Sequence, residues 1–129
     1  MNLTFMNLEA NQFSGPVPLE LGDLVNLETL MLSSNQLTRN LPVTFSLLRN
    51  RIDFRINDNN FSGRIPSFIQ NWEQLNRLEM HASGLKGPIP SSLSLLKNLT
   101  ILRISDINGP SQDFPVLRNM KRLATLYVL

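Results

Sequence analysis

The sequence predicts an α/β solenoid, in which leucine-bearing coils of about 24 residues share one parallel β-sheet on a concave face and carry short helical turns on the convex side. Three observations support this fold class. Asparagine recurs at a constant interval, at positions 11, 35 and 59; leucines stand at fixed offsets before it; and a proline follows it at a constant distance. A unit this short cannot bury a core alone, so neighbouring units must stack and share one.

Each coil is expected to begin with a short strand, as in residues 27–32. Leu30 and Leu32 lie on one side of such a strand, and Thr29 and Met31 lie on the other. The leucines are expected to face the core. Stacking then sets the strands about 4.8 Å apart in one parallel sheet, whose outward residues form the expected binding surface. The spacing of leucines and asparagine is the pattern of a leucine-rich repeat.

The bend after each strand holds a polar side chain that is expected to point inward. Asn11, Asn35 and Asn59 form this predicted structural ladder. Their amides are tolerated inside only if they bond to backbone groups of their own coil and the adjacent one. Ser83 can take over part of this role in a later coil, but Ile107 cannot.

The segment after the bend is predicted to turn sharply and then to start a helical turn. Glycine permits a tight bend, and proline forces the residue before it to be extended. A proline at a constant place in the coil can open a short helical turn, and it recurs at Pro18, Pro42, Pro66 and Pro90. The single tryptophan, Trp72, lies in an inward row with leucines and is predicted to be core.

Two coils depart from this template. Arg51 occupies a place that other coils fill with leucine, so either its guanidinium reaches outward to solvent or the strand shifts to bring Ile52 in. Residues 107–115 lack the usual proline signature, and the convex side is expected to be irregular there.

We interpret residues 1–129 as one leucine-rich-repeat domain of about five coils, open at both ends and without caps. An isolated chain is therefore expected to be marginally stable and to self-associate through unpaired strands. The net charge of +2 is spread along the coils, which argues against nucleic acid as a partner. No apolar run approaches the roughly 20 residues of a membrane span, so this segment is not expected to insert into a membrane.

Catalytic chemistry finds no support in the sequence. Asp53 and Phe54 are followed by Arg55 rather than by the glycine of a kinase metal-binding motif. His81 is the only histidine and is expected on an open sheet, where a catalytic base lacks a pocket. With no cysteine, a metal site built from several histidines or cysteines is excluded. We expect a chain that binds without catalysing, and that carries no cofactor or metal.

Charged residues crowd the centre of the predicted concave face. They can form a recognition patch, or they can pair across neighbouring strands, with Asp53 facing Arg77 and Glu79 between two arginines. Each such cross-strand pair contributes about 0.2–1 kcal/mol, and we favour pairing. Contacts with a ligand are then expected first from the uncompensated side chains and second from the charges. The candidates are Phe5, Met31, Asn57, His81 and Tyr127, followed by Arg55, Glu79 and Arg103.

Three asparagines match the acceptor pattern for an N-linked glycan, and they are Asn2, Asn60 and Asn98. Asn60 is expected to point outward between the inward Asn59 and Phe61. Asn98 directly precedes a strand. All three are glycosylation candidates if the protein is secreted.

The repeat at residues 59–66, Asn-Asn-Phe-Ser-Gly-Arg-Ile-Pro, resembles the plant-specific leucine-rich repeats of receptor-like kinases and receptor-like proteins. More narrowly, residues 102–110 and 114–120, after 68–72, resemble ectodomains of plant receptor kinases that also carry a malectin-like domain. The resemblance implies a segment at the extracellular face of the plasma membrane, belonging to a receptor with a serine/threonine kinase. It implies as partner a peptide, an oligosaccharide or a co-receptor ectodomain. The alternative is a secreted or cytosolic repeat protein that inhibits an enzyme or acts as a structural adaptor.

Overall fold

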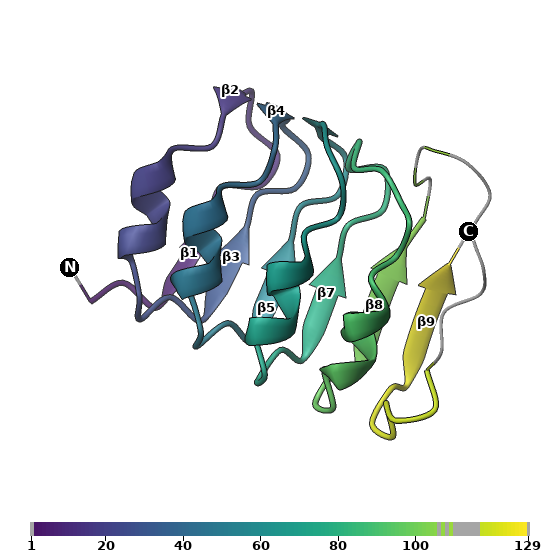
Figure 1. The fold of residues 1–129 in the computed structure, drawn as a ribbon. Helices are drawn as coiled ribbons and strands as arrows, with labels where there is room; N and C mark the ends of the chain where they lie inside the picture. The colour runs from purple at the N-terminus through teal and green to yellow at the C-terminus, as the bar shows by residue number, and fades with distance from the viewer. Residues whose placement is uncertain (1, 106, 108, 110–116, 129) are drawn as a thin grey trace.

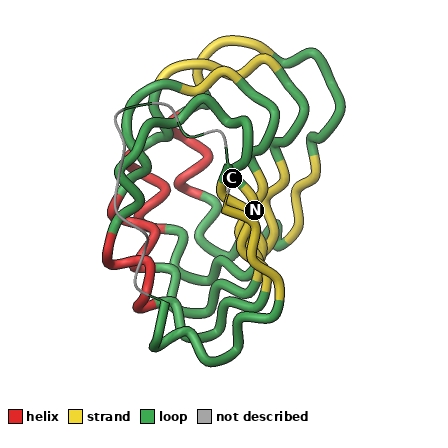
Figure 2. The backbone as a smooth tube through the Cα atoms, turned by 90° about the vertical axis from the view of Figure 1, so that its right-hand side faces the viewer, coloured by secondary structure: helices red, strands yellow, loops and turns green. Residues whose placement is uncertain are grey.

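The computed structural model describes residues 2–105, 107, 109 and 117–128. Its coils stack side by side along one axis, so that each coil of the chain lies next to the coil before it (Figure 1). Strands line one side of the stack and short helices line the other (Figure 2). The predicted solenoid is confirmed.

Over the described part of the chain, the concave sheet contains six strands in the order β1-β3-β5-β7-β8-β9, and every neighbouring pair is parallel. Each residue faces the residue at the same place in the next coil, as Phe5 faces Thr29 and Thr29 faces Asp53. An apolar residue at the inward position of each strand fixes this register, because a shift by one residue would turn the apolar side outward. The strands are β1 (Phe5–Asn7), β3 (Thr29–Met31), β5 (Asp53–Arg55), β7 (Arg77–Glu79), β8 (Ile101–Ile104) and β9 (Thr125–Val128).

A second sheet, which the sequence analysis did not predict, runs along another side of the stack. It pairs β2 (Ser14–Pro16), β4 (Gln36–Arg39) and β6 (Asn60–Phe61) in parallel. A single bridge between Arg64 and Lys86 continues the pairing into the next coil. These strands follow the asparagine bend, where the sequence shows a turn signal rather than an apolar alternation.

The convex side carries four short 3-10 helices among the described residues, and each begins directly after one of the recurring prolines. Proline fixes the extended backbone that precedes each helix and cannot donate a backbone hydrogen bond. The inward residues Phe45, Ile69 and Leu93 are buried, while Leu21 is half-buried. The helices are η1 (Leu19–Asp23), η2 (Val43–Leu47), η3 (Ser67–Asn71) and η4 (Ser91–Leu95).

The core lies between the concave sheet and the 3-10 helices, and its largest side chain is Trp72. That side chain is fully buried, as predicted, and its indole Nε1 donates to the carbonyl oxygen of Phe45 at 3.0 Å. Phe54 packs edge-on against it with ring centroids 4.8 Å apart. Burying each such side chain stabilises the fold by about 1.5–3 kcal/mol.

The asparagine ladder joins successive coils through their backbones. Nδ2 of Asn35 donates to the carbonyl of Leu32 in its own coil and to that of Leu8 in the preceding one, at 3.1 and 2.9 Å. Asn59 repeats this arrangement one coil later. In the later coil, the one side-chain hydrogen bond of Ser83 within the described residues is accepted from the Leu85 amide at 3.4 Å, which matches its expected partial role.

Both predicted fates of Arg51 are wrong. Arg51 is 0% exposed, and Ile52 stays 37% exposed, so the guanidinium neither reaches solvent nor gives way to the neighbouring residue. It lies 6.0 Å from the centre of the Trp72 ring, and its three nitrogens have no hydrogen-bond partner among the described residues. Burial lowers the pKa of Arg51 to about 10, against an opposing effect of Asp53.

The irregular segment predicted at residues 107–115 lies mostly outside the described residues. In the part of the chain that the structure describes, no helix has the length and apolar character needed to cross a membrane.

Candidate binding face

The candidate site is the outward side of the concave sheet, which exposes aromatic side chains near both ends and charges in the middle. Phe5 on β1 is 56% exposed and Tyr127 on β9 is 48% exposed. Between them, β5, β7 and β8 present a charged cluster, defined here as Asp53, Arg55, Arg77, Glu79 and Arg103.

The charged cluster is organised around one carboxylate. The side chain of Glu79 is only 6% exposed, and its oxygens lie 3.1 Å from Arg77 Nη2 and 3.4 Å from Arg103 Nη1. Arg55 Nε approaches it at 3.9 Å. Three guanidinium groups thus surround a nearly buried acid, and such pairing offsets the cost of removing that carboxylate from water.

Pairing among these charges was predicted, but the geometry differs in one respect. Asp53 and Arg77 are register partners, yet Asp53 binds Arg55 two residues along its own strand, at 2.8 and 2.9 Å. This fork is bidentate, the strongest geometry for an arginine and a carboxylate. The hydrogen bond to Asp53 is the main cause that raises the pKa of Arg55.

The cluster carries a net charge of +1, because three arginines face two carboxylates. The excess positive charge lies toward Arg103. The guanidinium of Arg103 also lies 4.8 Å from the ring centre of Tyr127. Such a cation over an aromatic face is attracted by about 0.5–1 kcal/mol at an exposed site. Tyr127 was expected to lack a partner, and this contact corrects that expectation.

Two further candidates are less available than the sequence suggested. Met31 points outward but is only 9% exposed. Asn57 accepts a hydrogen bond from Ser33 Oγ at 2.5 Å and donates one to Asp58 Oδ2 at 2.9 Å, so its amide is already occupied.

His81 lies just after β7. It is half-buried, and its Nδ1 is a buried atom that has no hydrogen-bond partner among the described residues. The Nε atoms of Arg77 and Arg103 are also buried and have no hydrogen-bond partner among the described residues. Atoms this buried are out of reach of a ligand in this arrangement, whereas the side chains of Arg77 and Arg103 as a whole stay 32% and 39% exposed.

The three glycosylation candidates differ in their surroundings. Asn60 is exposed, and the structure shows no hydrogen bond from its side chain among the described residues. Asn2 accepts from Asn26 Nδ2 at 3.1 Å. Asn98 donates to the carbonyl of Glu73 at 3.3 Å and accepts from Arg122 Nη1 at 3.0 Å.

Sequence reasoning missed that Asn2 and Asn98 belong to a second polar row, which bonds coil to coil beside the sheet. The signal was present, because Asn2, Asn26 and Asn50 recur with the same period as the asparagine ladder. Within the described residues, no group of three histidine, cysteine, aspartate or glutamate side chains is placed to hold a metal ion.

Comparison with known proteins agrees with this geometry. The family model of the Leucine Rich Repeat matches residues 2–24 and 26–48. No curated protein matches the chain significantly in sequence. Solved structures do match, and the chain therefore has the leucine-rich-repeat fold.

Three of these structures are informative. The Arabidopsis receptor kinase HAESA, solved with the peptide hormone IDA and the co-receptor SERK1, is 32% identical with a TM-score of 0.87; the match covers 98% of this chain and 21% of HAESA. The plant peptide hormone receptor RGFR1, in complex with RGF2, is 26% identical with a TM-score of 0.83, covering 98% of this chain and 20% of RGFR1. A plant ice-binding protein is 28% identical with a TM-score of 0.67, covering 80% of this chain and 34% of that protein.

Proposed function

We propose that this chain is a ligand-recognition segment from the extracellular part of a plant receptor-like serine/threonine kinase, and that it binds through its concave face. The chain spans only about a fifth of the HAESA and RGFR1 chains that it matches, so the kinase and the membrane anchor would belong to other parts of the parent protein. The narrower resemblance suggests the group of receptors that also carries a malectin-like domain.

The observation that carries this proposal is the charged cluster, whose ion pairs hold partly exposed arginines in place on the concave sheet. The ion pairs around Glu79 fix the three arginines in place, so little conformational entropy is lost when a ligand binds. The side chains of Arg77 and Arg103, 32% and 39% exposed, then offer polar contacts, and Tyr127 offers aromatic area against Arg103. Rigid aromatic and arginine side chains are the residues that most often dominate binding energy.

A peptide is the ligand class that we favour over an oligosaccharide or a co-receptor ectodomain. HAESA, which shares this fold, was solved with a peptide hormone, and RGFR1 is a peptide hormone receptor. An extended peptide can lie across the strands and reach aromatic area and the charged cluster together.

The experiment is a selection of linear peptides from a random display library on the immobilised chain, followed by binding to variants. We expect His81→Ala and Tyr127→Ala to weaken the selected peptides by about tenfold or more, the effect of losing a hot-spot side chain. Leu95→Ser, on the exposed side of η4, is the matched control and should bind as the wild type does. Peptides that respond to Leu95→Ser and ignore both concave variants would contradict a concave recognition site.

A second function is favoured by one observation. The same fold occurs in a plant ice-binding protein, so it also serves plant proteins other than receptors. The alternative is therefore a secreted or cytosolic repeat protein that inhibits an enzyme or acts as an adaptor. The reading frame of the parent gene separates the two, since a downstream membrane span and kinase support the receptor and a stop after a capping coil supports the alternative.

A further inference from the structure

Arg39 breaks the repeat at a place where the chain otherwise uses glycine. The residues one period before and after it are Gly15 and Gly63, whose φ angles are 80° and 81°. Arg39 adopts the same left-handed backbone with φ 66°. A side chain makes this conformation unfavourable, whereas glycine adopts it freely. The fold would therefore be more stable with glycine at this position.

Nothing inside the described part of the molecule compensates for that strain. The Arg39 side chain is exposed and makes no ion pair or side-chain hydrogen bond among the described residues. Its carbonyl accepts from the Ser62 amide at 3.0 Å, but a glycine would accept that bond equally well. Strained residues that the fold does not need concentrate at binding sites.

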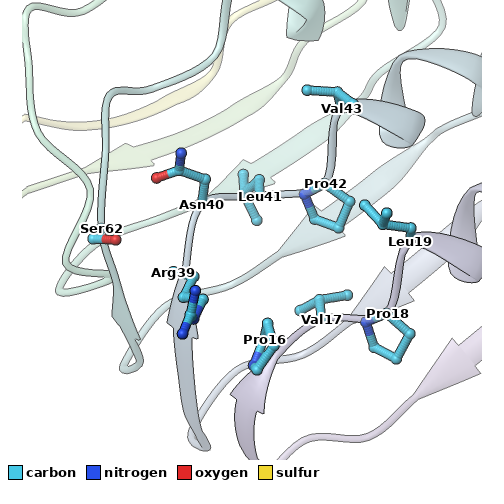
Figure 3. Close-up of a pocket in the computed structure, with 10 residues that line it drawn as sticks. All are labelled: Pro16, Val17, Pro18, Leu19, Arg39, Asn40, Leu41, Pro42, Val43 and Ser62. Carbon is cyan, nitrogen blue, oxygen red and sulfur yellow. The ribbon is translucent and has the colours of Figure 1, made fainter.

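Arg39 stands at one end of a hollow of about 630 Å³ on the side of the first coils, away from the concave sheet. This hollow, called here the proline groove, has walls made by Pro16, Pro18 and Pro42 and a polar end made by Arg39, Asn40 and Ser62 (Figure 3). Its size falls in the range of about 300–1,000 Å³ that is usual for ligand sites.

The rest of the proline groove is apolar. Leu19 is 57% exposed and Val43 is 73% exposed, and both stand at its edge beside the proline rings (Figure 3). Val17 and Leu41 are buried and close its floor. Exposed aliphatic side chains that gather beside one cation mark a surface for an amphipathic partner better than scattered ones do.

Charge defines that partner further. None of the described residues that line the groove is acidic. The exposed Arg64 and Lys86, bridged on the following coils, extend the positive edge beyond Arg39. An exposed, unpaired guanidinium binds a carboxylate through charge-assisted hydrogen bonds that are often bidentate.

We propose that the proline groove docks an extended segment of a partner protein, in which aliphatic residues or prolines stand next to an acidic side chain. The aliphatic part lies against the proline rings, Leu19 and Val43, and the carboxylate binds Arg39. This surface is separate from the concave face, so a ligand and the partner segment can be bound together.

The test uses a capped pentapeptide of leucine, proline, leucine and two glutamates, and a second peptide with glutamines in place of the glutamates. Each is titrated into the isotopically labelled chain while amide resonances are followed by NMR. We expect saturable shifts at Val17, Leu41 and Ser62 with the glutamate peptide, and binding about tenfold weaker with the glutamine peptide, as for loss of a charge-assisted contact.

Two variants separate the groove from general charge attraction. Arg39→Gly should melt no lower than the wild type, because it restores the repeat, and should bind the glutamate peptide about tenfold more weakly. Arg49→Ala removes the same charge at an exposed position that does not line the groove, and it should bind like the wild type. The proposal is overturned if no saturable shifts appear, if both peptides bind equally, or if the two variants weaken binding equally. Shifts confined to the concave face would also overturn it. Shifts that depend on protein concentration without peptide would overturn it too, because the occupant would then be a second copy of the chain.

Discussion

Among single residues, Arg51 departs most from what its position requires. A guanidinium without hydrogen-bond partners among the described residues fills a place that leucine holds in the coils on either side, at Leu27 and Leu75. Desolvation of such a charge costs free energy, and a cation 6.0 Å from the Trp72 ring regains only part of it.

We predict that Arg51→Leu stabilises the fold by about 1–3 kcal/mol, since it removes a buried charge and adds apolar burial. Urea melts of the two proteins measure the change. Arg49→Leu is the control, because Arg49 is exposed and its replacement should shift stability by no more than about 0.5 kcal/mol. A destabilised Arg51→Leu would mean that the guanidinium has a partner in solution.

The same substitution gives a pH signature. The folded pKa of Arg51, about 10, lies below its ordinary value, so the unfolded chain binds this proton more tightly. The loss of folding stability caused by burying the charged guanidinium is therefore complete below pH 10, and it shrinks as pH rises through and above that value. The stability difference between Arg51→Leu and the wild type should be flat from about pH 6 to 9 and should narrow above about pH 10. A stability difference that widens above about pH 10 would contradict the lowered pKa of Arg51.

The surroundings of each candidate asparagine are expected to determine whether it carries a glycan. In a secretory eukaryotic host we predict a glycan at Asn60, whose side chain is exposed, and little or none at Asn98, whose amide is bonded on both sides. Mass spectrometry of the secreted protein measures occupancy, with Asn60→Gln and Asn98→Gln as paired controls. Full occupancy of Asn98 beside an empty Asn60 would show that these surroundings do not govern modification.

Among the elements, the second sheet depends on close approach of one coil to the next. Gly84 has φ 94°, and a Cβ built on it would overlap the carbonyl oxygen of Phe61 in β6 and lie 2.9 Å from the Phe61 nitrogen. Gly15 has φ 80° with no atom within 4 Å of such a Cβ. The two glycines therefore share the backbone requirement but differ in the space available.

We predict that Gly84→Ala costs more stability than Gly15→Ala, by about 1–3 kcal/mol for the added steric conflict. Both variants lose about 1–2 kcal/mol for the left-handed backbone, so their difference isolates the packing effect. Denaturant melts provide the comparison. Equal losses would mean that β6 can move away from Gly84 without cost.

Across the whole molecule, protection of the core varies along the stack. The inward residue of the concave strands is fully buried in β5 and β7, at Phe54 and Leu78, but Leu126 in β9 is 38% exposed and Met6 in β1 is half-buried. In a stack where each coil contacts only its neighbours, local opening should follow this gradient.

We predict that backbone amides of β5 and β7 exchange at least about tenfold more slowly than those of β1 and β9, because opening them requires exposing the aromatic core. Hydrogen exchange followed by mass spectrometry of peptic fragments measures this. Uniform exchange along the stack would indicate that the chain opens as a single cooperative unit.

Sequence alone was enough for those parts of the fold that repeat. The strand register, the burial of Trp72 and the hydrogen bonds of the asparagine ladder all follow from a period that is visible in the leucines. Sequence reasoning failed where one residue breaks the period, since the fate of Arg51 depends on how much space the neighbouring side chains leave. It also misassigned the partners of Asp53, because a register identifies neighbours but not which rotamers form a bond.

The constant register has a consequence for how the chain can change in length. Thr29 faces Asp53 and Asp53 faces Arg77, each one full period further along the chain. Removing one whole period that contains β5 would bring Thr29 opposite Arg77 with every other backbone partner unchanged, whereas removing part of a period would misalign all later strands. Duplication or loss of genetic material can therefore widen or narrow the recognition surface by one row at a time, without redesigning the rows that remain.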